Sequence, residues 1–207
     1  MDEITQLSGE YADSDQFQSV VDVARFYNTI GIRNFLNERL PPSRDFTRAR
    51  LLMTAYVQTN PLDELAWLEL GISNARLSLL TPNTLKRGYY QRRAMKNFGQ
   101  ALHINRLNEA TLFAIGRLYY EQKKYGIACL FFERALEVNA NHFPSRTWLI
   151  RGYQKQKEYG LAEVLAKETI ALQSVDQVSQ RRKLEALAFL MRLNQKQDYM
   201  IREGGNS

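Results

Sequence analysis

The sequence predicts an all-α fold: a right-handed helical-repeat solenoid of about four helix-turn-helix units, followed by a C-terminal capping helix. Two segments align at an offset of about 34 residues, a period typical of helix-turn-helix repeats. Hydrophobic residues make up 44% of the 207-residue chain, which is enough for the continuous core that stacked repeats require. The five prolines fall where long helical patterns break: Pro41, Pro42, Pro61, Pro82 and Pro144.

The repeat is clearest in the second half of the chain. The string Lys-Lys-Tyr-Gly-Ile-Ala at 123–128 is followed one period later by Lys-Glu-Tyr-Gly-Leu-Ala at 157–162. These strings predict one repeat unit at 109–142 and a degenerate copy at 143–176. Four side chains recur at the same spacing, with Tyr119, Tyr125, Ala128 and Leu136 matched by Tyr153, Tyr159, Ala162 and Ile170.

The unit at 109–142 resembles the tetratricopeptide repeat (TPR). The resemblance implies two antiparallel helices, in which the small Gly116 and Ala128 allow a close approach. The rings of Tyr119 and Phe132 are then expected to fill the space between the helices. The residues that match the family pattern are Ile115-Gly116, Tyr119, Ala128, Phe132 and Ala135, while Ala140 replaces the usual terminal proline.

The unit at 62–108 carries the same features at a wider spacing. Gly71 and Ala94 are 23 residues apart, whereas Gly116 and Ala128 are 12 apart. This difference predicts an 11-residue insertion around residues 80–91, in which Thr81 or Asn83 caps the following helix. The remaining matches to the pattern are Trp67, Leu70, Phe98 and Ala101.

The two ends of the chain match the pattern less well. Residues 1–16 are expected to form a flexible N-terminus, and 17–61 a degenerate helical pair. Residues 177–203 are expected to form the capping helix and tail, which shield the last repeat from water. The apolar residues at helical spacing in this segment are Leu184, Leu187, Ala188 and Met191.

Residues that carry chemistry are scarce. His103 and His142, the two histidines, both fall at repeat ends, where a helix C-terminus favours them electrostatically. Cys129, the single cysteine, falls in the aligned small-residue stretch and is expected to be a packed apolar residue. The sequence contains no glycine-rich phosphate loop and no Cys/His cluster. We therefore predict no catalytic residue, no metal and no cofactor.

We expect neither a secretory signal nor a transmembrane segment. Its longest uninterrupted apolar run is residues 127–132, against the roughly 20 residues that a membrane-spanning helix needs. A single cysteine fits a reducing compartment. These features predict a cytoplasmic location.

The resemblance to TPR proteins implies a concave groove, lined by the first helix of each repeat, that binds a segment of another protein. Arg117 is expected to pair with Glu121 one turn later, whereas Arg151 faces the like charge of Lys155 and needs an anion between them. The groove should therefore accept an apolar anchor with acidic residues. The positions expected to line it are Leu65, Leu68, Ile72, Arg76, Phe113, Arg117, Tyr120, Thr147, Arg151, Gln154 and Lys155.

The insertion is a second candidate site because basic residues flank tyrosines there. Such a segment can dock protein, hold nucleic acid or lie on anionic lipid, and protein docking is favoured. The net charge of +6 raises the chance of an acidic partner without identifying one. The residues of this basic insertion are Lys86, Arg87, Tyr89, Arg92, Arg93 and Lys96.

The sequence thus favours a non-catalytic scaffold or adaptor for protein partners within a multiprotein complex. Two alternatives stay open. One is a dedicated assembly or secretion chaperone that holds one client. The other, less favoured, is an RNA-associated helical-repeat protein.

Overall fold

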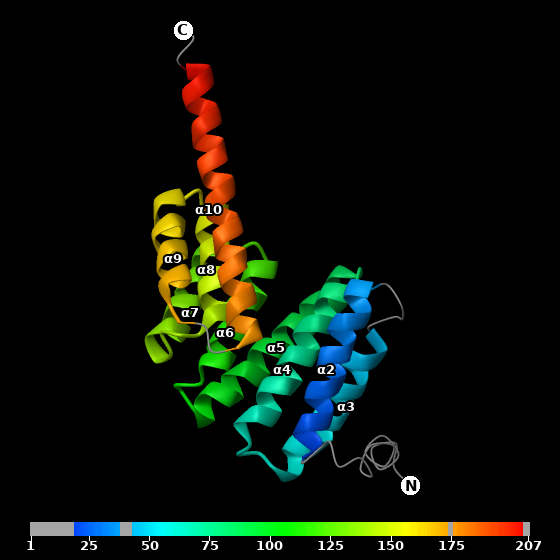
Figure 1. The fold of residues 1–207 in the computed structure, drawn as a ribbon. Helices are drawn as coiled ribbons and strands as arrows, with labels where there is room; N and C mark the ends of the chain where they lie inside the picture. The colour runs from blue at the N-terminus through cyan, green and yellow to red at the C-terminus, as the bar shows by residue number, and fades with distance from the viewer. Residues whose placement is uncertain (1–18, 38–42, 174–175, 205–207) are drawn as a thin grey trace. The chain divides into compact units, whose positions relative to one another are not determined.

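The computed structural model describes residues 19–37, 43–173 and 176–204; the predicted flexible N-terminus lies outside them. Within these ranges the structure consists of nine helices and no strand, so the all-α fold class is confirmed (Figure 1). The helices are α2 (Val20–Asn37), α3 (Ser43–Thr59), α4 (Glu64–Leu80), α5 (Thr84–Ile104), α6 (Glu109–Glu121), α7 (Tyr125–Val138), α8 (Phe143–Lys155), α9 (Tyr159–Ala171) and α10 (Gln177–Gly204).

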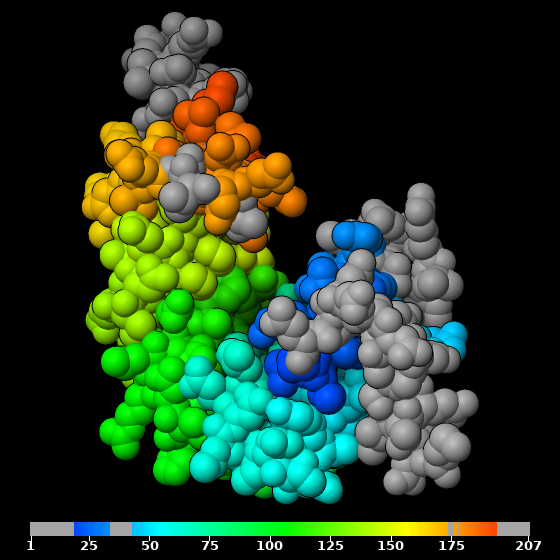
Figure 2. Space-filling view, turned by 60° about the horizontal axis from the view of Figure 1, so that its bottom comes forward, coloured from blue at the N-terminus to red at the C-terminus, as the bar shows by residue number. Residues whose placement is uncertain are grey.

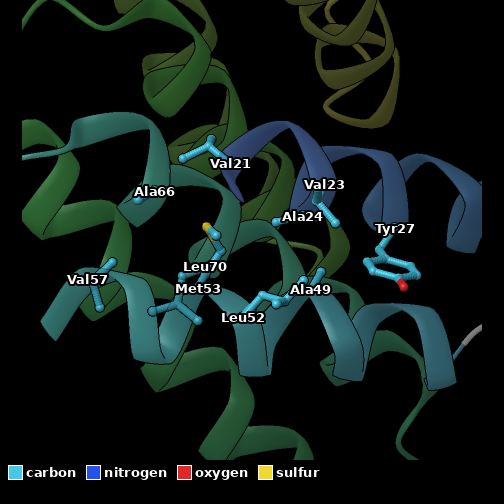
Figure 3. Close-up of a cluster of buried hydrophobic side chains, with 10 residues drawn as sticks. All are labelled: Val21, Val23, Ala24, Tyr27, Ala49, Leu52, Met53, Val57, Ala66 and Leu70. Carbon is cyan, nitrogen blue, oxygen red and sulfur yellow. The ribbon is translucent and has the colours of Figure 1, made fainter. Parts of the chain in front are cut away.

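The chain divides into two compact units, Met1–Ala114 and Ile115–Ser207, which we call unit 1 and unit 2. In unit 1, apolar side chains of α2, α3 and α4 gather into a core around Ala24, Leu52 and Met53 (Figure 3). In unit 2, a core around Ile150, Ala162 and Phe189 joins α8, α9 and α10. Each core buries the apolar faces that a single helix pair could not cover alone.

A glycine packed against a phenylalanine ring recurs in both units. A Cβ atom placed on Gly116 would lie 2.5 Å from the ring of Phe132, so only glycine allows α6 this close to α7. Gly71 and Phe98 make the same contact between α4 and α5 in unit 1. The predicted close approach is confirmed for Gly116. The equivalent contact of Gly31 with Phe46 between α2 and α3 was not predicted.

The 11 extra residues of the second helix pair do not form the separate insertion that the spacing predicted. They lengthen both helices instead. The α4 helix has 17 residues against 13 in α6, and α5 has 21 against 14 in α7, while both connecting turns have three residues. Asn83 caps α5, as predicted, because its side-chain oxygen accepts a hydrogen bond from the Lys86 amide at 2.9 Å. The basic residues therefore lie on a helix.

The α10 helix covers the last repeat, but not with the face that the sequence indicated. Its buried apolar residues, among the side chains described, are Ala186 and Phe189, which pack against α8 and α9. Leu184, Leu187 and Met191 are instead 65%, 43% and 57% exposed. The prediction was wrong about the face because α10 carries two apolar faces, and periodicity does not tell which one meets the repeat. Figure 1 shows α10 beside α8 and α9 and extending past both, and Figure 2 shows its orange residues at the surface.

Candidate functional site

Two arginines in unit 2 pack against the same tryptophan ring. The guanidinium carbon of Arg117 on α6 lies 3.6 Å from the centroid of the Trp148 ring on α8. The guanidinium carbon of Arg151 lies 4.7 Å from the same centroid. The ring of Tyr120 meets Trp148 edge-on, with their centroids 5.0 Å apart. Because cations and ring edges both favour an aromatic face, Trp148 holds these three predicted groove residues together.

Each of the two arginines also has a carboxylate partner within unit 2. The predicted pair of Arg117 with Glu121 is present, with an Nη2 to Oε1 distance of 3.2 Å. Arg151 donates from Nη2 to Glu185 Oε2 on α10 at 3.1 Å. The chain itself therefore supplies Arg151 with an anion. Glu185 also pairs with Arg182 at 3.1 Å and with Arg181 at 3.7 Å, so four residues share this cluster of charge.

A groove of about 300 Å³ lies between α8 and α10 beside this cluster. Its walls combine apolar side chains with three arginines and one carboxylate. The exposed apolar residues Leu184, Leu187 and Met191, which we call the α10 stripe, run along the same helix and contribute Leu184 to the groove. The lining residues are Thr147, Ile150, Arg151, Arg181, Leu184, Glu185, Ala186, Ala188, Phe189 and Arg192.

The other predicted groove residues differ in how far a partner could reach them. Leu68 and Thr147 are buried, and the Thr147 hydroxyl donates to the Phe143 carbonyl oxygen at 3.1 Å, so neither presents a side chain to a partner. Leu65 and Lys155 are exposed. The half-buried positions are Ile72, Arg76 and Phe113 in unit 1, and Gln154 in unit 2.

Two arginines of the basic insertion make hydrogen bonds within the chain. Arg87 donates to the carbonyl oxygens of Thr81 at 3.1 Å and Pro82 at 3.3 Å, so it fastens the turn before α5. Arg93 donates from Nε to the Tyr89 hydroxyl at 3.1 Å and lies 5.5 Å from the centroid of that ring. All five cations of the segment are exposed: Lys86, Arg87, Arg92, Arg93 and Lys96.

A second pocket, of about 240 Å³, lies in unit 1 among α3, α4 and α5. Three residues of the basic insertion line it, together with Arg50 and Trp67, which the sequence did not indicate as site residues. We call it the α3–α5 pocket. Its lining residues are Arg50, Thr54, Val57, Gln58, Trp67, Leu70, Asn74, Tyr89, Arg93, Lys96 and Asn97.

The cluster around the single cysteine is not arranged for nucleophilic chemistry. Cys129 is buried, and this burial, with the nearby Glu133 carboxylate, raises the pKa of its thiol to about 11. Burial and the hydrogen bond to Glu133 also raise the pKa of Tyr153 well above its usual range; the Tyr153 hydroxyl donates to Glu133 Oε1 at 2.7 Å. Both groups are therefore protonated at neutral pH, and the thiolate that attacks is scarce.

Two kinds of feature are missing from the parts of the chain that the structure covers. The described residues contain no group of three His, Cys, Asp or Glu side chains that could hold a metal ion. Every described helix is too short or too polar to span a bilayer.

The arrangement of paired helices defines a helical-repeat protein, and comparison with solved structures assigns the repeat type. The TPR protein TTC0263 of Thermus thermophilus superposes with a TM-score of 0.69 and 14% identity, over 89% of each chain. The MamA RS-1 ArsTM double mutant gives a TM-score of 0.52 and 14% identity, over 87% of this chain and 99% of its own. No protein-family model matches the sequence, and no curated protein matches it. The chain therefore has the TPR fold.

Two residues of the unit 2 cluster were not predicted, although the repeat period could have indicated one of them. Glu185 lies 34 residues after Arg151, so extending the repeat period into α10 places the two at equivalent positions of neighbouring helices. Trp148 carried no such signal, because its ring packs between two repeats and the equivalent position one period earlier is Ala114.

Proposed function

We propose that the protein is a non-catalytic binding module, a scaffold or adaptor that holds a segment of a partner protein along α10. The observation that carries this proposal is the α10 stripe, in which three large apolar side chains remain exposed on a helix whose opposite face is already packed. Exposed apolar side chains that share one face are typical of protein-binding surfaces. The TPR fold supports the same interpretation, since arrays of this kind bind peptides and helices.

The charges beside the stripe favour a partner segment that is acidic as well as apolar. Arg181 and Arg192 line the groove next to Leu184; the Arg181 side chain is 82% exposed, although its Nε atom also lies 3.7 Å from Glu185 Oε1. A helix with apolar residues three or four apart and carboxylates on its flanks would cover the stripe and pair with these arginines. A second copy of α10 would instead bring like charges together. A single segment of this size should bind with a Kd on the order of micromolar.

The test compares two exposed leucines. Leu187→Glu places a like-sized charge within the stripe, whereas Leu130→Glu makes the same change on α7, where Leu130 is also exposed. Each variant and the wild type would be used to isolate partners from the native source, with thermal melting as the check on folding. We expect a discrete partner to bind wild type and Leu130→Glu and to lose at least ten-fold in affinity for Leu187→Glu. A partner that binds all three equally would contradict the proposal.

A second candidate, a chaperone that holds one apolar client, is favoured by the α7 and α9 surfaces. Ile127 and Leu130 are exposed on α7, and one repeat period later Leu161 and Val164 are exposed on α9. The recurrence places apolar residues where a solvated helix face would be polar. For this function, Leu130→Glu rather than Leu187→Glu would release the client and let it aggregate, which light scattering would detect.

A further inference from the structure

The α3–α5 pocket of unit 1 has the composition of an anion site, and we propose that it binds the phosphate group of a phosphorylated side chain from a partner protein. The pocket lies in unit 1, whereas the α10 stripe lies in unit 2. The proposal therefore stands on different residues from the proposed function.

Three cations line the pocket from two helices. Arg50 comes from α3, and Arg93 and Lys96, three residues apart and so on one helix face, come from α5. None of the described residues that line the pocket is Asp or Glu, so no carboxylate there neutralises this charge. Three cations without a counter-charge repel one another unless an anion binds among them.

Arg50 contributes an unsatisfied hydrogen-bond donor beside the pocket. Its Nε atom is buried and has no hydrogen-bond partner among the described residues. A buried donor without an acceptor costs free energy, and this cost is higher for a charged group. The nitrogen is also closed to a water molecule, so an oxygen atom bound in the pocket would remove that cost only after the Arg50 side chain turns toward it.

Arg93 is held in place for the same task. Tyr89 accepts a hydrogen bond from the Arg93 Nε atom at 3.1 Å, and its ring lies under the guanidinium group. The hydrogen bond uses one of five N–H donors, so the four on the two Nη atoms remain for an acceptor. A phosphate monoester offers several oxygens and close to two negative charges, which matches the fork of a guanidinium group.

The size and walls of the pocket favour a protein side chain over nucleic acid. Its volume of about 240 Å³ lies below the ~300 to 1,000 Å³ typical of small-molecule sites. Trp67, Leu70 and Val57 supply apolar walls that suit the carbon atoms of a side chain next to its phosphate. A nucleic-acid strand would need cations that follow its backbone over several phosphates, not one enclosed group.

The test titrates the purified full-length protein with O-phosphoserine, with serine and with a single-stranded RNA of twelve nucleotides, followed by NMR. Arg93→Gln removes one pocket cation, and Arg92→Gln is its matched control, because Arg92 is exposed on the same helix and does not line the pocket. Lys96→Gln gives a second, exposed variant in case Arg93→Gln disturbs folding. We expect saturable phosphoserine binding, weakened about ten-fold or more by Arg93→Gln and Lys96→Gln and unchanged in Arg92→Gln.

Three results would overturn the proposal: no saturable phosphoserine binding, equal binding of serine, or equal weakening by the Arg92 and Arg93 variants. RNA binding that falls steeply with salt and depends equally on Arg92 and Arg93 would identify a nucleic-acid surface instead. Leu187→Glu should bind phosphoserine like wild type. The proposal for the pocket and the proposal for the α10 stripe can therefore be refuted independently.

Discussion

Two pairs of arginines, one pair in each unit, differ in whether they have a carboxylate partner. In unit 2, Arg117 and Arg151 share one tryptophan ring, and each pairs with a carboxylate of the same unit. In unit 1, Arg50 and Arg93 line a pocket whose described lining has no carboxylate. The difference teaches that an excess of positive charge does not locate a binding site. The position of the nearest carboxylate decides whether an arginine is occupied within the fold or available to a ligand.

The units also place their carboxylates at different depths, and this difference gives the largest expected effect. Glu69 in unit 1 is only 5% exposed and joins α4 to α2. It accepts hydrogen bonds from Asn28 Nδ2 at 2.8 Å and Arg25 Nε at 3.1 Å, and Asn28 in turn accepts one from the Ser73 hydroxyl at 3.1 Å. Glu121 in unit 2 pairs with Arg117 near the surface.

We expect Glu69→Ala to lower the free energy of unfolding by about 2 to 3 kcal/mol, because it leaves buried polar groups without partners. Glu121→Ala should cost under about 1 kcal/mol, as surface pairs contribute little. Urea unfolding of both variants measures the two changes. Equal costs would mean that the buried network of unit 1 contributes no more than an exposed ion pair.

Both units pack a glycine against a phenylalanine ring, and substitutions of glycine test whether this packing requires the two helices to lie so close together. Gly116→Ala in unit 2 places a Cβ atom 2.5 Å from the ring of Phe132, which is fully buried and cannot move aside. We expect it to destabilise the protein by about 1 to 3 kcal/mol through overpacking. Gly99→Ala in unit 1 is the matched control, since a Cβ there meets nothing within 4 Å. It should stabilise α5 by about 0.5 to 1 kcal/mol, because alanine is the better helix former.

Thermal melting checks both variants. A lower melting temperature for Gly116→Ala and a higher one for Gly99→Ala would separate the effect of packing from that of helix propensity. If Gly116→Ala melts like wild type, the glycine is not required for the helix contact, and the alignment of residues 109–142 with the repeat pattern loses its physical basis.

The sequence was informative about the fold because the repeat places the same contact at the same spacing. The repeat period and the Gly116 and Phe132 positions were enough to predict paired helices. The longer α4 and α5 were predicted only as extra residues, because spacing counts residues and does not say whether they form a turn or further helix. Two apolar faces on α10 likewise left its packing side undetermined.

The candidate sites were harder to predict because they depend on side chains from different helices. Arg93 and Lys96 were recognised as basic residues, but Arg50 lies far earlier in the chain and joins them only because α3 and α5 both pack against α4. Arg151 was recognised, but Glu185 reaches it from α10. Local patterns carry no information on such contacts unless a repeat period connects the two positions.

The smallest expected effect concerns the turns within the helix pairs, where unit 2 again differs from unit 1. Among the described non-glycine residues, positive φ angles occur at Lys123 and Lys157, both in unit 2 and one repeat period apart. At Lys123 the φ angle is 61°, a left-handed conformation that costs a residue with a Cβ atom roughly 1 to 2 kcal/mol. The turn is closed by the Lys124 amide, which donates to the Tyr119 carbonyl oxygen at 3.0 Å.

Lys123→Gly should therefore raise the free energy of unfolding by about 0.5 to 1 kcal/mol, because the relief of strain exceeds the entropy that glycine adds to the unfolded chain. Lys124→Gly is the control: its φ angle is −88°, so glycine relieves no strain and should cost about 0.5 to 1 kcal/mol. Urea unfolding measures whether the free energy of unfolding rises or falls in each variant. A loss of stability in both variants would show that the turn is not strained at Lys123, and that entropy alone governs glycine at either position.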